Sequence, residues 1–198
     1  MRIVPNATEG ADILQGTSVD DTFNGLGGSD QIFGGAGADT ISGNEGNDAL
    51  YADAYSSQTD PALGTDVEGT WNRLFGDTGD DLLVSGAGFD DLWGGSGNDT
   101  LTGGAGADWF VFEPGSGVDT ITDFTPGTDN IIVMANMNGA GEPVVSQNAD
   151  GTVVDFGGGN AVLLQGVALS ELPADAIVTA PYSDEASFYS TAVNALLG

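Results

Sequence analysis

The residues best suited to chemistry in this chain are aspartates that return at a fixed interval. When the sequence is written in rows of nine from Ala7, and again from Val67, column six holds a carboxylate in every row but one. The column-six residues are Asp12, Asp21, Asp30, Asp39, Asp48, Asn72, Asp81, Asp90, Asp99 and Asp108. Regularly spaced carboxylates suit a hard cation such as Ca²⁺, which takes about six to eight oxygen ligands.

Glycine fills most of columns one and four and recurs in column two, so the turns can present backbone carbonyls with no side chain in the way. We expect these carbonyls to complete the metal sites. The carbonyl candidates are Gly25, Gly27, Gly28, Gly34, Gly35, Gly37, Gly43, Asn44, Gly46, Gly76, Gly79, Gly86, Gly88, Gly94, Gly95, Gly97, Gly103, Gly104 and Gly106.

Column eight is apolar in every row. One apolar residue in nine is too sparse for a helix face, but it suits a strand of about three residues whose middle side chain points inward. Each row should therefore form a glycine turn and a short strand, and two rows should form one coil of a stack. The predicted fold is all-β: a parallel β-roll (β-solenoid), then a β-rich C-terminal cap and a short C-terminal helix.

Because two rows make one coil, alternate aspartates should lie on the same edge of the roll. The expected stacks are Asp12 with Asp30 and Asp48; Asp21 with Asp39; Asp81 with Asp99; and Asn72 with Asp90 and Asp108. Stacked carboxylates repel each other unless a cation lies between them. A flexible Gly/Asp-rich linker is the alternative, but a linker would not keep column eight apolar over ten rows.

The chain carries 30 acidic and 2 basic residues, a formal net charge of −28, which excludes nucleic acid and anionic membranes as electrostatic partners. A halophilic surface is also acidic. Here, however, 23 of the acidic residues are aspartate and many occupy fixed columns, which favours ligation. The absence of His and Cys removes thiolate sites and His-containing triads. No segment has the composition of a transmembrane span or an N-terminal signal peptide.

Residues 34–42, 94–102 and 103–111 follow the pattern GGxGxDxUx, in which U is a large apolar residue. They resemble the nonapeptide of the repeats-in-toxin (RTX), or hemolysin-type, calcium-binding family. The likeness continues through 106–112 and 117–124 to 127–129, in the way that RTX β-rolls end. The resemblance implies that column-six aspartates and turn carbonyls bind several Ca²⁺ ions. It adds Asp12, Asn72, Asp119 and Asp123 as further metal candidates.

The resemblance also implies a bacterial protein that reaches the extracellular space through a type I secretion apparatus and its ABC exporter, without a cleaved N-terminal signal peptide. We expect a non-catalytic module that stays expanded in Ca²⁺-poor cytosol and folds outside the cell when Ca²⁺ binds. The alternative is a Ca²⁺-dependent module that binds a polysaccharide or cell-surface ligand and is related to a larger secreted enzyme or adhesin. A small enzyme acting on an acidic polysaccharide is a third possibility.

Three segments are expected: a β-roll over residues 7–132, a β-rich cap over 133–180, and an amphipathic helix over 181–198 that is either part of a secretion signal or packed on the domain. Residues 52–66 interrupt the register, as a surface loop or as an irregular metal site using Asp53, Asp60 or Asp66. Rows 7–15, 16–24 and 67–75 depart from the pattern and are interpreted as capping turns.

Aromatic residues gather near the strands of the roll. Tyr51, Tyr55, Trp71, Trp93 and Trp109 could line a sugar-binding face, or cover a sheet or a dimer contact. By column, Tyr51, Trp93 and Trp109 should point outward.

Overall fold

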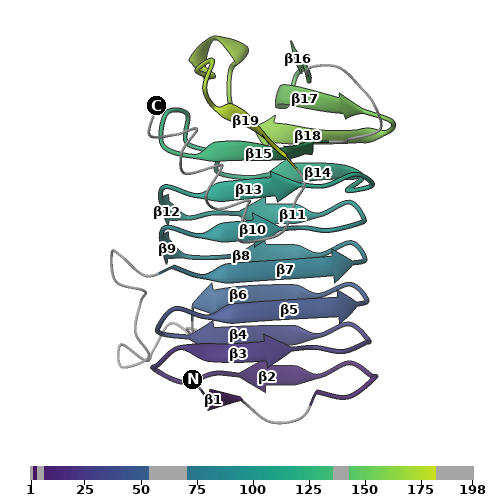
Figure 1. Cartoon of the computed structure of the whole chain (residues 1–198), viewed down its shortest axis with the longest axis vertical. Helices are drawn as coiled ribbons and strands as arrows, with labels where there is room; N and C mark the ends of the chain where they lie inside the picture. The colour runs from purple at the N-terminus through teal and green to yellow at the C-terminus, as the bar shows by residue number, and fades with distance from the viewer. Residues whose placement is uncertain (1, 4–6, 54–70, 136–142, 182–198) are drawn as a thin grey trace.

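A computed structural model describes residues 2–3, 7–53, 71–135 and 143–181. The chain winds into a stack of flattened coils, and each coil places one strand in each of two facing sheets (Figure 1). The coils rise in sequence order from the N-terminal strands at one end to strands β15–β19 at the other (Figure 1). The predicted all-β parallel roll is therefore confirmed.

Within the described residues, one sheet is entirely parallel and the other ends in an antiparallel meander. In spatial order the first contains β1 (Arg2–Ile3), β3 (Asp21–Asn24), β5 (Thr40–Glu45), β7 (Arg73–Thr78), β10 (Asp91–Trp93), β13 (Trp109–Phe112), β15 (Asn130–Ala135) and β19 (Ile177–Pro181). The second contains β16 (Val144–Gln147), β17 (Gly151–Gly157), β18 (Asn160–Gln165), β14 (Val118–Ile121), β11 (Thr100–Thr102), β8 (Leu82–Val84), β6 (Ala49–Asp53), β4 (Gln31–Gly35) and β2 (Ile13–Gln15). Two turn segments, β9 (Ala87–Gly88) and β12 (Ala105–Gly106), pair with each other, and a 3₁₀ helix, η1, spans Leu169–Glu171.

The apolar side chains of column eight fill the interior of the roll. Register pairs them along the stack, as where Leu92 lies between Leu74 and Phe110. The column-eight residues, all buried in one cluster, are Leu14, Phe23, Ile32, Ile41, Leu50, Leu74, Leu83, Leu92, Leu101 and Phe110. Their inward orientation was predicted and is confirmed. Each strand contributes so little apolar surface that the turns need another source of stability.

The interruption of the register leaves the roll continuous. Strand β7 pairs directly with β5, and β8 pairs directly with β6, although residues 52–66 separate the two blocks. Residues 54–70 lie outside the described ranges, and so does the side chain of Asp53. The irregular metal site considered for Asp53, Asp60 or Asp66 therefore falls outside the described part of the chain.

The C-terminal strands extend both sheets of the roll. β15 pairs with β13, and β18 pairs with β14, so β15 runs across the expected boundary after residue 132. The predicted hairpin at Asp150-Gly151 is confirmed, because β16 and β17 are antiparallel on either side of it. Residues 182–198 lie outside the described ranges, including nearly all of the predicted C-terminal helix.

A second apolar cluster lies on the outer face of the parallel sheet. It contains Trp109, Val111, Ile132 and Met134, which are all buried, and Phe89 meets Trp109 edge to face at 5.0 Å. Trp109 thus points away from the interior, as predicted, yet only 3% of its surface is exposed. A fully exposed platform of tryptophans is therefore absent from this part of the described sheet.

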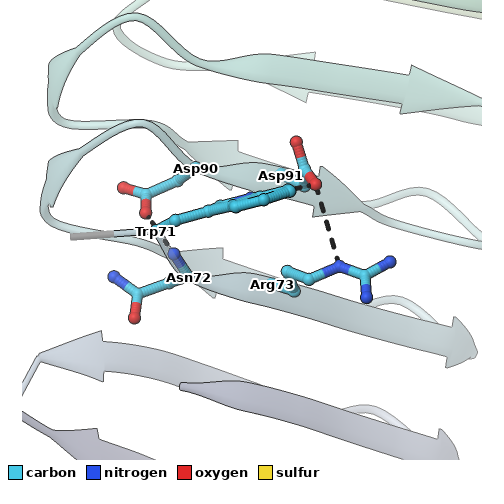
Figure 2. Close-up of polar contacts among 5 residues, drawn as sticks. All are labelled: Trp71, Asn72, Arg73, Asp90 and Asp91. Carbon is cyan, nitrogen blue, oxygen red and sulfur yellow. Dashed lines mark hydrogen bonds and ion pairs between the residues drawn. The ribbon is translucent and has the colours of Figure 1, made fainter. Parts of the chain in front are cut away.

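A buried carboxylate lies on the same outer face. Trp71 Nε1 donates to Asp91 Oδ2 at 3.1 Å, and Arg73 Nε lies 3.8 Å from the same oxygen (Figure 2). Asp91 has no exposed surface. These contacts join β10 to β7, the first strand after the interruption, without any need for a metal.

Candidate calcium-binding turns

The column-six residues form two ladders, one along each edge of the roll. In each ladder, the backbone N–H of one member donates to the side-chain Oδ1 of the next, over 2.6–3.1 Å. One ladder contains Asp12, Asp30, Asp48, Asp81, Asp99 and Asp119. The other contains Asp21, Asp39, Asn72, Asp90, Asp108 and Asp129. The four predicted stacks are confirmed, and the structure joins them into two.

Asn72 keeps its ladder intact where the carboxylate is missing. Its side-chain Oδ1 accepts the Asp39 N–H at 2.9 Å. Its own N–H donates to Asp90 Oδ1 at 2.8 Å, as Figure 2 shows. An amide can therefore perform the hydrogen-bonding role of this column. Only a carboxylate adds the negative charge that a cation requires.

The second carboxylate oxygen has no hydrogen-bond donor in six members of the ladders. These Oδ2 atoms are buried, and they belong to Asp30, Asp48, Asp81, Asp99, Asp108 and Asp119. A buried oxygen without a partner costs about 1–3 kcal/mol, and more when it is charged. Six repetitions of this feature indicate a ligand, because buried polar atoms are otherwise almost always satisfied.

Burial also makes these carboxylates hard to ionise without a cation. It raises the pKa of Asp81 to about 7 and that of Asp99 to about 6. It raises the pKa of Asp108 and of Asp119 to about 8, and the charges of ladder neighbours add to both shifts. A bound divalent cation would remove this penalty by favouring the charged form.

Glycine in column one leaves space beside five of these six Oδ2 atoms, all except that of Asp119. A Cβ atom added to Gly25 would lie 2.5 Å from Asp30 Oδ2 and 2.5 Å from the carbonyl oxygen of Gly43. Gly34 and Gly76 have the same kind of surroundings, each with a carboxylate oxygen and the carbonyl of a neighbouring row. A carboxylate oxygen and a carbonyl oxygen thus converge on one small space that only glycine keeps open. This donor set fits Ca²⁺.

The other predicted carbonyls also lie between rows. Column-four carbonyls, such as those of Gly28, Gly46 and Gly79, face the column-four glycine of the next coil. In column two, the Gly86 carbonyl accepts a hydrogen bond from Ala105 N–H at 2.8 Å. The column-one carbonyls of Gly43 and Gly94 each approach the same space as an Asp Oδ2, which makes them well-placed donors. Among the described residues, no cluster of three acidic, His or Cys side chains forms a metal site.

Two turn conformations distinguish the rows. Column two has a positive φ in the interior rows, even where it is not glycine, as at Leu26 (77°), Asn44 (75°) and Asp77 (73°). Left-handed backbone is unfavourable for such side chains, so the turn itself must require it. Three rows near the ends have threonine in column two instead, at Thr8, Thr17 and Thr125, and none of these has a positive φ.

The threonine rows are closed by hydrogen bonds. The N–H groups of Thr8 and Thr17 donate at 2.6 Å to the Oδ2 of Asp12 and Asp21, respectively. The hydroxyl groups of both threonines donate to the same oxygens, at 2.9 and 2.8 Å. Thr125 N–H likewise donates to Asp129 Oδ2 at 2.7 Å. The oxygen that lacks a donor in the interior rows is thus satisfied in these end rows, as expected for the capping turns at 7–15 and 16–24. The third row expected to cap, 67–75, does not do so, because its strand β7 pairs with β5 and β10 in the interior of the sheet.

Two sequence assignments need adjustment. Asp123 does not join a ladder: its two oxygens accept the N–H groups of Gly103 and Gly104, at 3.0 and 2.7 Å, so it closes a turn instead. Asp129 does join a ladder and was not among the candidates. Gly127 and Ile131 flank it at the repeat's usual spacing, but Asp129 follows Asp108 by 21 residues instead of 18.

The fold and these turns define a class of protein: a parallel β-roll whose edges carry repeated cation sites made of carboxylates and carbonyls. The RTX calcium-binding nonapeptide repeat family matches the chain four times, over residues 6–41, 24–54, 75–110 and 85–121. The chain therefore belongs to the RTX family through these repeats, and it binds several Ca²⁺ ions.

Two solved structures are similar to the chain. The extracellular lipase LipA from Serratia marcescens shares 21% identity at a TM-score of 0.48, over 88% of this chain and 39% of the lipase. The AlgE6R3 subunit of the Azotobacter vinelandii mannuronan C5-epimerase shares 28% identity at a TM-score of 0.36, over 92% of this chain and 86% of the subunit. No curated protein sequence matches the chain significantly. Within the described ranges, no helix is long and apolar enough to cross a membrane.

Proposed function

We propose that this chain is a non-catalytic folding module of a type I secreted bacterial protein, whose aspartate ladders couple folding to Ca²⁺ binding outside the cell. The observation that carries the proposal is the set of six buried Oδ2 atoms without a donor. In the absence of Ca²⁺, folding must bury these charges beside like charges, which opposes the compact state. When these carboxylates bind Ca²⁺, the free energy of binding stabilises the folded state.

The proposed ligands are the column-six carboxylates of the interior rows, with column-one carbonyls beside them. The carboxylates are Asp30, Asp39, Asp48, Asp81, Asp90, Asp99, Asp108 and Asp119. Asp21 is a weaker candidate, because Thr17 already donates twice to its Oδ2. Because each carboxylate shares its space with a carbonyl of the next coil, each ion would be held by oxygens of two stacked coils.

The same coupling of folding to Ca²⁺ binding supports the proposed export. A chain with a net charge of −28 and no Ca²⁺ is expected to stay expanded in the cytosol, and so to remain competent for export through the ABC exporter of a type I apparatus. External Ca²⁺ would then fold the chain after export. The absence of His and Cys and the presence of only 2 basic residues leave few groups for catalysis, which supports a non-catalytic role.

Circular dichroism of the chelator-treated chain tests the coupling. We expect little β structure without metal and a cooperative gain on adding Ca²⁺, while Mg²⁺ at the same concentration gives much less, because it prefers a smaller octahedral shell. Native mass spectrometry should count several bound Ca²⁺ ions. A fully folded spectrum after removal of Ca²⁺ would contradict the proposal.

Export has a separate test. The chain should be secreted by cells that carry a type I exporter and retained by cells in which the ABC component is deleted. Retention in both strains, with normal Ca²⁺-induced folding of the purified protein, would reject secretion while leaving the folding module intact.

A further inference from the structure

A small cavity lies outside the calcium-binding turns, on the outer side of the parallel sheet. Its volume is about 200 Å³, and its walls include Phe75, Asp77, Trp93, Ser96, Glu113 and Pro114. These residues come from the C-terminal ends of β7, β10 and β13 and the turns that follow them. The cavity is therefore built from three successive coils on one edge of the roll.

An irregularity in the repeat creates one wall. Ladder aspartates on this edge normally follow each other at 18 residues, but Asp119 follows Asp99 at 20. The two additional residues are Phe112, which is buried in the interior, and Glu113, which lines the cavity. The departure from the nonapeptide thus places a carboxylate where a regular row would have none.

The floor of the cavity is aromatic. The rings of Phe75 and Trp93 lie on adjacent strands with centroids 5.8 Å apart and planes tilted by 35°. The guanidinium of Arg73 lies 5.4 Å from the centroid of the Phe75 ring, within the range of a cation–π contact. Aromatic faces in a negative field favour cations through the ring quadrupole.

The charge of the cavity is also suited to a cation. Asp77 and Glu113 contribute two carboxylates, and the described lining contains no Lys, Arg, Asn or Gln side chain. Burial raises the pKa of Glu113, and the charge of Asp77 adds to the shift. A neutral sugar also needs donors for its ring and hydroxyl oxygens, and this lining is mostly acceptors. A group that only donates hydrogen bonds and carries positive charge fits it better.

We propose that this cavity binds a small organic cation, an alkylammonium or guanidinium group, between the Phe75 and Trp93 rings and the carboxylates of Asp77 and Glu113. The apolar part of the ligand contacts the rings, and the charged end donates to the carboxylates. The net charge of −28 concentrates such cations near the surface at low ionic strength. The site does not depend on the export proposal.

The test is an NMR titration of the full-length, Ca²⁺-loaded chain with butylammonium chloride, at constant chloride and Ca²⁺. We expect saturable shifts of the Trp93 indole N–H and of the Gly95, Ser96 and Gly115 amides, with Gly151 unaffected. The neutral control, 1-butanol, should leave these signals in place. Equal shifts with 1-butanol would overturn the proposal, because they would show a merely apolar patch.

Two variants and one control test which side chains bind the cation. Glu113→Gln keeps the shape and should weaken binding by about fivefold or more, which corresponds to about 1 kcal/mol. Phe75→Leu should weaken it as well, and Glu9→Gln, an exposed acid near the N-terminal end of the roll, should not. Circular dichroism checks that each variant folds with Ca²⁺. Unchanged affinity in Glu113→Gln, displacement of butylammonium by additional Ca²⁺, or preferential binding of methyl glucoside would each reject the site.

Discussion

The backbone N–H of Asp48 donates to Asp81 Oδ1 at 2.6 Å, although 33 residues separate them in sequence. The same bond joins residues 18 apart in regular rows, as between Asp30 and Asp48. The ladder is thus formed across the interruption as it is elsewhere. Ca²⁺ sites on both sides of residues 52–66 should consequently fold as one cooperative unit.

Deletion of residues 54–68 tests this continuity, because it makes a nine-residue row that runs from Ala52 to the strand of Arg73. We expect the same number of bound ions and an unchanged or slightly lower Ca²⁺ midpoint, since halving a loop lowers its closure cost by only about 0.6 kcal/mol. Native mass spectrometry and a Ca²⁺ titration by circular dichroism measure both quantities. Two separate folding transitions in the deletion variant would show that the insertion is needed to connect the blocks.

The period of nine made much of this arrangement predictable. The interior residues could be predicted from column eight, because side chains alternate along a strand. The stacking of Asp30 on Asp48 could be predicted because two rows form one coil. The left-handed backbone at Leu26 was not predictable from residue type, whereas Asn44 and Asp77 are residue types that tolerate it. There the packing of neighbouring rows determines the turn.

Other features depend on contacts that a periodic pattern does not contain. Asp129 escaped prediction because three additional residues shift it from the count of nine, although Gly127 and Ile131 mark its row. The burial of Trp109 depends on Phe89 and Ile132, which come from other parts of the chain. A threonine four residues before a column-six aspartate was the available signal for the capping rows.

Gly25→Ala should remove one ion. Its Cβ would lie 2.5 Å from both Asp30 Oδ2 and the Gly43 carbonyl oxygen, in the space proposed for Ca²⁺. We expect the Ca²⁺ midpoint of folding to rise by about tenfold, or about 1.4 kcal/mol. Gly27→Ala is the matched control in the same turn, because the nearest atom to its Cβ is the mobile end of Glu9 at 3.3 Å. If both variants bind the same number of Ca²⁺ ions, no ion is bound between Asp30 Oδ2 and the Gly43 carbonyl oxygen.

Asp81→Asn separates the two roles of a ladder aspartate. The amide oxygen can still accept the Asp48 N–H, as Asn72 does for Asp39, but the charge is lost. We expect one ion fewer and a higher Ca²⁺ midpoint, together with more residual structure in the metal-free chain, since one buried charge is gone. Asp80→Asn, at the exposed neighbouring position, should change neither the ion count nor the midpoint, because an amide oxygen can still accept the Asn98 N–H. Equal effects of the two substitutions would mean that net charge alone is responsible.

The metal-free fold should become more stable as pH falls. Burial raises the pKa of Asp99 to about 6 and that of Asp108 to about 8, whereas an unfolded aspartate titrates near about 3.9. The folded state therefore binds more protons between these values, so its stability is fully present below about pH 4 and is lost as pH rises through about 6 to 8. Circular dichroism of the Ca²⁺-free chain should show more β structure at pH 5.5 than at pH 8. When Ca²⁺ is present at a limiting concentration, β structure should instead be greater at pH 8, because protons compete with Ca²⁺ for the carboxylates. A β content that does not change with pH in the absence of Ca²⁺ would contradict the raised pKa values.

Thr17→Val should weaken a capping row without removing an ion. The substitution deletes the hydroxyl that donates to Asp21 Oδ2 at 2.8 Å but keeps the Thr17 N–H bond at 2.6 Å. A hydrogen bond to a charged group contributes about 1.5–3 kcal/mol, and partial exposure places this one near the lower value. We expect thermal unfolding of the Ca²⁺-loaded chain at a lower temperature, with the ion count unchanged. Thr22→Val, in the adjoining strand β3, should have little effect, because valine suits a strand. Loss of an ion in Thr17→Val would show instead that the Asp21 row is a metal site.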